Sequence, residues 1–141
     1  MSWDGLIFRA PEVRSVNDLP KDYVLPSLGT TEEIGTVLRE LFPDQSHHHG
    51  QCCVEGDGFW LELNFGYPKD KPVREHIGVR CNAGLGAMSV LRQVCEAFAA
   101  RLVDVQTSDF ADFDADTQTS MRTFAEWRDR NLSPRDSTHE D

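Results

Sequence analysis

The residues best suited to metal chemistry form one cluster, in which three consecutive histidines precede two adjacent cysteines: His47, His48, His49, Cys52 and Cys53. Zinc binds imidazole nitrogen and thiolate sulfur at tetrahedral angles. Side chains of consecutive residues diverge, however, and the chain has no Cys-x-x-Cys pair that would supply half of a zinc site. We therefore interpret residues 44–50 as a polar loop beside a half-buried strand, and we predict no metal ligand.

A second group of candidate residues lies between positions 109 and 116, where aspartates are interleaved with phenylalanines. Asp112, Asp114 and Asp116 have the alternation that begins an EF-hand calcium loop. Thr117 occupies the position of the required glycine, and the next glutamate is Glu126. Calcium binding is therefore not predicted, and a solvated acidic turn that caps a following helix explains the same residues.

This acidic segment also suits a protein interface, because apolar anchors surrounded by charge are typical of tight complexes. We predict that its aspartates and phenylalanines contact a partner: Asp109, Phe110, Asp112, Phe113, Asp114 and Asp116. The alternative is that both phenylalanine rings are buried in the core.

The outward face of a predicted strand over residues 59–65 is a further candidate. Apolar and polar residues alternate there, which is typical of a strand with one buried face. Trp60 and Glu62 then point outward, and tryptophan is enriched at interface hot spots. We predict that both side chains contact the partner.

The next predicted strand, 73–81, places Arg74, His76 and Arg80 on this same outward face, while Val73 points inward. Two alternatives to an interface follow. Glu62, His76 and Arg80 would surround a ligand in a small enzyme or ligand-binding domain, or the residues would form a cross-strand lattice without a functional role.

Motifs for covalent or nucleotide chemistry are not found in the sequence. Cys95 lies on the apolar stripe of a predicted helix, whereas Cys81 and His76 point to opposite faces of one strand. The chain contains no Gly-x-Ser-x-Gly motif, and Gly84-Leu85-Gly86 lacks the lysine of a phosphate-binding loop. We therefore predict no catalytic residue, no cofactor and no enzymatic activity.

The hydrophobic pattern predicts an α+β fold, with an antiparallel meander sheet of about four to five strands and two or three helices packed on one face. Thr30 and Glu33 have the spacing of a capping box at the start of the first helix. The expected strands are 3–10, 51–55, 59–65, 73–81 and 102–106, and the expected helices are 30–42, 87–101 and 117–132. We expect one domain over residues 1–132 and a polar tail over 133–141.

Composition narrows the possible partners. The 141 residues carry a formal charge of −10, which disfavours direct binding to nucleic acid or to an anionic membrane surface and favours a basic partner. No secretion signal or membrane span is recognisable, so we expect a cytoplasmic protein whose four cysteines are free thiols.

Two stretches carry a resemblance to a known class of proteins. The chain opens with Met1-Ser2-Trp3-Asp4-Gly5-Leu6-Ile7-Phe8-Arg9-Ala10-Pro11, and residues 90–110 supply a helix, a strand and an acidic turn in which Ser108-Asp109 replaces a usual Gly-Glu pair. This layout resembles the small single-domain immunity proteins of bacterial toxin systems. The resemblance implies an inhibitor that binds a cognate toxin domain, with an effector chaperone or adaptor as the alternative.

Overall fold

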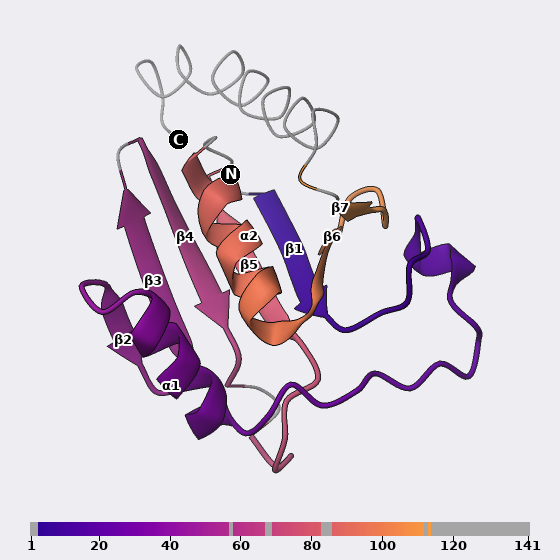
Figure 1. Cartoon of the computed structure of the whole chain (residues 1–141), viewed down its shortest axis with the longest axis horizontal. Coiled ribbons are helices and arrows are strands. Elements are labelled where there is room, and N and C mark those ends of the chain that lie inside the picture. Colours follow the sequence, from indigo (N-terminus) through magenta and orange to yellow (C-terminus); the bar gives the residue numbers. More distant parts are fainter. Residues whose placement is uncertain (1–2, 57, 67–68, 83–85, 112, 114–141) are drawn as a thin grey trace, which may run out of the picture.

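The computed structural model describes residues 3–56, 58–66, 69–82, 86–111 and 113, and this part of the chain contains one seven-stranded antiparallel sheet and two α-helices (Figure 1). The strands are β1 (Trp3–Phe8), β2 (Ser46–His48), β3 (Gln51–Gly56), β4 (Phe59–Asn64), β5 (Ile77–Cys81), β6 (Arg101–Asp104) and β7 (Phe110–Ala111). The helices are η1, a single 3-10 turn (Val16–Asp18), α1 (Thr31–Leu41) and α2 (Gly86–Phe98). None of the described helices is long and apolar enough to cross a bilayer.

The α+β class is confirmed, but the strand count is higher than the four to five predicted. Strand β2 forms within the segment 44–50 that we interpreted as a loop, and β7 forms within the acidic segment. Both strands are short edge strands that depend on a neighbour for their hydrogen bonds, so their sequences carry little periodic signal. The predicted helix 117–132 and tail 133–141 lie outside the described residues.

The order of the strands across the sheet is β2-β3-β4-β5-β1-β6-β7. Strands β3 to β5 form the expected meander, β2 extends it at one edge, and the first strand of the chain pairs with β5 at the other edge. Strand β1 pairs with β5 on one side and with β6 on the other, both antiparallel. At the centre of the sheet, the N-terminal strand β1 therefore lies between β5 and β6.

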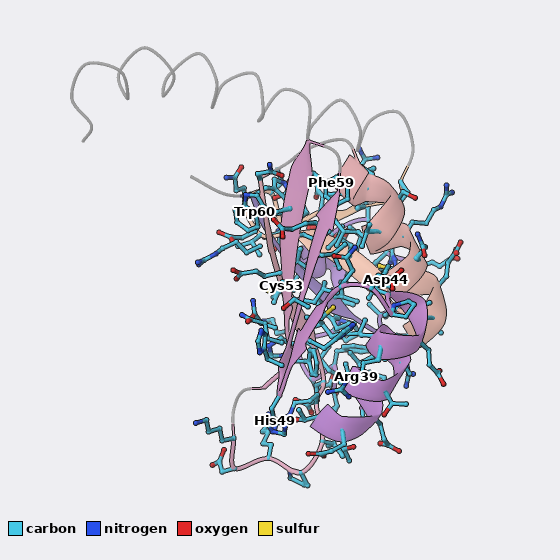
Figure 2. All side chains as sticks on the ribbon, turned by 90° about the vertical axis from the view of Figure 1, so that its left-hand side faces the viewer. Arg39, Asp44, His49, Cys53, Phe59 and Trp60 are labelled. Atoms are coloured by element: carbon cyan, nitrogen blue, oxygen red, sulfur yellow. The ribbon has the colours of Figure 1, made fainter. Side chains whose placement is uncertain are left out.

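Both α-helices lie on one face of the sheet, as Figure 2 shows in side view. Helix α1 begins with the predicted capping box, in which Thr30 Oγ1 accepts from the Glu33 amide and Glu33 Oε1 accepts from the Thr30 amide. The core between this helix layer and the sheet contains fully buried side chains from every layer, including Ile7, Ile34, Leu63, Leu91 and Leu102.

The opposite face of the sheet has a smaller core of its own, over β1, β6 and β7. Phe8, Val103 and Phe110 are buried there beneath the long segment that connects β1 to α1. That segment contributes the apolar side chains Val13, Val16, Leu19 and Leu25. The Arg101 guanidinium holds it in place by donating to the carbonyl oxygens of Pro11 and Val13.

The strand predicted over 73–81 is shorter than expected, and two of its side chains point the other way. Val73 is 37% exposed, not inward-facing, and Arg74 is buried, not on the outward face. Strand pairing begins only at Ile77, because the backbone of Arg74 instead exchanges hydrogen bonds with Leu28 and Gly29, at 2.7 Å each. The alternation of inward and outward side chains therefore applies within β5, from Ile77 onward, but not to residues 73–76.

Gly5 in the central strand offers a direct test of this packing. A Cβ atom there would lie 2.9 Å from the Trp3 ring and 3.0 Å from Leu102 Cδ1, and both side chains are buried. Gly5→Ala is expected to destabilise the fold by about 1–3 kcal/mol through overpacking, measured by urea denaturation.

Gly78→Ala is the matched control, because a Cβ there meets only ordinary contacts, at 3.6 Å or more. This second variant is expected to stay within about 1 kcal/mol of the unmodified protein, since alanine in a strand also restricts the unfolded chain. Equal effects of the two substitutions would contradict the packing described for Trp3.

Candidate functional site

The outward side of β2 to β5, together with Asp4 of β1, forms a polar surface that we call the open face. Register and burial assign it these residues: Asp4, Ser46, His48, Gln51, Cys53, Glu55, Trp60, Glu62, Asn64, Gly78 and Arg80. In Figure 2 its labelled members Trp60 and Cys53 lie on the side of the sheet away from the helices. The apolar side chains of the segment over β1, β6 and β7 pack against Phe8, Val103 and Phe110.

Trp60 is the large apolar side chain of the open face. It is 36% exposed, and its Cα is paired with that of exposed Glu55 on β3. The Asn82 side chain accepts a hydrogen bond from the Trp60 amide at 3.2 Å, which fixes the end of β4. The structure therefore presents Trp60 to solvent, as predicted, next to a carboxylate.

Glu62 lies in a row of charged residues that crosses the open face. Its Cα neighbours are Cys53 on β3 and Arg80 on β5, and Arg80 is in turn the neighbour of Asp4. Arg80 Nε lies 3.5 Å from Asp4 Oδ1, with both side chains half exposed or more. Such an exposed pair contributes little to stability, but the two opposite charges offset each other at this point of the surface.

The structure describes only part of the acidic segment, residues 109–111 and 113. Asp109 is exposed in the turn between β6 and β7, where its amide donates to Thr107 Oγ1 at 3.2 Å. The preceding residue, Ser108, has φ = 65°, a left-handed conformation that glycine adopts more easily. Asp112, Asp114 and Asp116 lie outside the described residues, so their contact with a partner stays a prediction.

Phe110 is buried, not an exposed anchor, which is the alternative that the sequence left open. The residue is 6% exposed, and its ring packs edge-to-face on Phe8, with centroids 5.7 Å apart. The Arg101 guanidinium carbon lies 4.1 Å from the centroid of the Phe110 ring, a cation–π contact. Phe113 is partly buried against the main core. The anchor role predicted for Phe110 therefore needs correction: the edge strand β7 turns its ring into the smaller core.

The histidine–cysteine cluster is divided between the two faces of the sheet. His47 is the partner of Cys52 on the helix side, where its Nε2 lies 2.8 Å from the Phe42 carbonyl oxygen. His48 is on the open face, 3.3 Å from Ser46 Oγ. Among the described residues no group of three or more His, Cys, Asp or Glu side chains converges on one point.

The four cysteines are free and poorly suited to nucleophilic chemistry. Burial raises the pKa of Cys52 to about 11 and that of Cys95 to about 12. Partial burial raises the pKa of Cys53, with Glu62 and Glu55 adding to the effect. A raised pKa reduces the thiolate fraction at neutral pH, and the thiolate is the reactive form.

The structure does not align the three residues of the alternative site, Glu62, His76 and Arg80, along one register. His76 precedes β5, so it is outside the register that aligns Glu62 with Arg80. Neither of the two cavities described below contains any of the three side chains.

A cleft at the other end of the sheet was missed by the sequence reasoning. It has a volume of about 570 Å³ and lies between the first turn of α1, the β2–β3 turn and the loop after β4. Its lining comes from Thr31, His48, His49, Gly50, Gln51, Asn64, Gly66, Lys69 and Arg74. We call it the basal cleft. These residues come from four separate segments, so no local motif could have identified them.

A smaller hollow of about 310 Å³ lies at the C-terminal end of α2, between Arg92, Arg101 and Phe113.

Comparison with known proteins adds no family to this description: no family model matches the chain, and neither curated proteins nor solved structures give a match.

Thiol reactivity tests the placement of the cysteines. At pH 7.4 the native protein is expected to react with a thiol reagent only at Cys53, and more slowly than a free cysteine, while unfolding exposes all four thiols. Since the raised pKa suppresses the thiolate, the rate at Cys53 should keep rising as the pH increases above about 8.5, the ordinary cysteine value. Peptide mapping of the labelled sites provides the measurement, and fast labelling of Cys52 or Cys95 in the native state would contradict it.

Proposed function

We propose that this protein is a cytoplasmic binding protein of the immunity type, which neutralises a cognate toxin domain by docking its open face and the acidic segment against it. The observation that carries the proposal is the exposure of Trp60 between two carboxylate-bearing residues, Glu55 and Glu62, on that face. An aromatic side chain within a polar rim is the arrangement found at protein hot spots.

The shape of the open face supports a protein as the partner. Small molecules bind in concave sites that enclose most of their surface, whereas protein interfaces are broad. Side chains from β2 to β5 make a continuous surface across four strands, and neither described cavity includes Trp60 or Glu62. A broad sheet surface favours a macromolecule over a substrate.

Charge favours a basic partner. The open face carries three carboxylates, from Asp4, Glu55 and Glu62, against one guanidinium, from Arg80. The whole chain has a formal charge of −10, so its long-range field also attracts a basic domain. Toxin domains that act on nucleic acids or nucleotides need basic clefts, and an acidic surface complements them.

The first experiment recovers the partner with a tagged chain and then measures the affinity of the purified pair. Trp60→Ala is expected to weaken binding about 30-fold or more, as for a hot-spot residue worth about 2 kcal/mol. Glu62→Lys is expected to weaken it further at low salt. Calorimetry at two salt concentrations measures both effects.

Glu40→Lys on α1 is the matched charge reversal, because Glu40 is exposed on the helix layer, away from the open face. Its affinity should stay within about threefold of the unmodified protein, since only screened long-range charge changes. If Trp60→Ala and Glu62→Lys also leave the affinity unchanged, the open face is not the docking surface.

Inhibition of the partner's activity distinguishes an immunity-type inhibitor from an effector chaperone or adaptor. The recovered partner is expected to arrest growth when expressed alone, and co-expression of the unmodified chain, but not of a Trp60→Ala/Glu62→Lys double variant, should restore growth. A partner that keeps full activity in the purified complex would support an adaptor and overturn the inhibitor.

The acidic segment is tested by reversing charge at Asp112, Asp114 and Asp116 together. Substitution of all three by lysine is expected to reduce the affinity and to flatten its dependence on salt, because fewer opposite charges are screened. Unchanged affinity at both salt concentrations would restrict the interface to the open face.

A further inference from the structure

The basal cleft differs in charge from the rest of this acidic protein. Of its lining residues, Lys69 and Arg74 carry positive charge and His48 and His49 bring imidazoles, whereas no described lining residue is an aspartate or glutamate. The chain as a whole has 24 acidic against 14 basic residues, so a wall without carboxylates departs from its composition. The cleft therefore has the electrostatic character of an anion site.

The carboxylates nearest in sequence are not part of the lining. Glu32 follows Thr31 and Asp70 follows Lys69, and both side chains are exposed outside the cleft. Glu33 accepts from the Thr30 amide at 2.8 Å in the capping box of α1. Glu75 lies 3.3 Å from Lys71 Nζ, outside the cleft. None of these four carboxylates is in the lining, so the described groups that line the cleft are cations and hydrogen-bonding groups.

Arg74 is the rigid part of the cleft. It is 5% exposed, its Nε donates to Thr31 Oγ1 at 2.9 Å, and its Nη2 donates to the Lys71 carbonyl oxygen at 2.8 Å. Its backbone is fixed as well, by the hydrogen bonds to Leu28 and Gly29. A guanidinium held in this way is already ordered before a ligand binds. Ligand binding therefore does not carry the entropic cost of ordering this side chain.

The opposite wall is also fixed by the fold. Gln51 Nε2 donates to Asn64 Oδ1 at 2.9 Å across β3 and β4. Gly50 and Gly66 allow the two backbones to meet beside these amides, since a Cβ on Gly50 would lie 2.7 Å from Gly66 Cα. His49 lies at this end of the sheet, next to the loop that follows β4 (Figure 2).

We propose that the basal cleft binds the phosphate group of a small molecule. Phosphate carries close to two negative charges and accepts several hydrogen bonds, which suits an ammonium, a guanidinium, imidazole N–H groups, a hydroxyl and amides in one cleft. The volume of about 570 Å³ is in the range of small-molecule sites and leaves room for more than the phosphate itself.

The test titrates the full chain with inorganic phosphate at constant ionic strength, with chloride as the balancing anion, by isothermal titration calorimetry. The unmodified protein is expected to show saturable binding with a Kd of about 1 mM or tighter. Lys69→Gln and His49→Gln should each weaken it at least fivefold, because each removes a group of the lining.

Lys71→Gln is the matched control, since it removes the same charge two residues away, from a side chain paired with Glu75 outside the cleft. It should change the phosphate Kd less than twofold. Acetate in place of phosphate separates a phosphate site from a general anion site: acetate that binds as tightly as phosphate overturns the assignment. Absence of saturable phosphate binding, or equal effects of Lys69→Gln and Lys71→Gln, also overturns it.

Phosphate binding in the basal cleft can be tested separately from partner binding at the open face. Lys69→Gln is expected to leave the affinity for the recovered partner unchanged, and Trp60→Ala is expected to leave the phosphate affinity unchanged. A loss of both affinities in either variant would show one shared site, which contradicts the separation proposed here.

Discussion

The fold depends on the pairing of strand β1 with partners on both of its edges. Its residues hydrogen-bond to β5 on one side and to β6 on the other, so the N-terminal strand completes a sheet made by residues 46–111. Trp3 and Gly5 show how close this packing is, because the indole ring occupies the space that a side chain at Gly5 would need. Without β1 the meander and the β6–β7 pair would be two separate, smaller sheets.

The central position of β1 also divides the second face of the sheet into two halves. Beyond β1, the connecting segment covers β6 and β7, where Phe110 is held between Phe8 and Arg101. On the other side, the outer residues of β2 to β5 are exposed or half-buried. One continuous sheet therefore has a covered half that adds to the core and an open half that carries Trp60.

The open face and the basal cleft have opposite charge, although His48, Gln51 and Asn64 belong to both. Strand side chains supply the carboxylates of the open face, whereas the loop between β4 and β5 supplies the cations of the cleft, Lys69 and Arg74. Arg74 connects this loop to the start of α1, since its side chain reaches Thr31 while its backbone pairs with Leu28 and Gly29. A protein with a strongly negative total charge can in this way keep a local site of the other sign.

The sequence by itself determined the features that local periodicity encodes. The capping box at Thr30, the alternation around Trp60 and the apolar stripe of α2 each follow from spacing within one segment, and each agrees with the structure. Tertiary structure alone decided the rest. The place of β1 at the centre of the sheet, the burial of Phe110 and of Arg74, and the basal cleft all depend on contacts between distant segments, and a single sequence contains no local signal for such contacts.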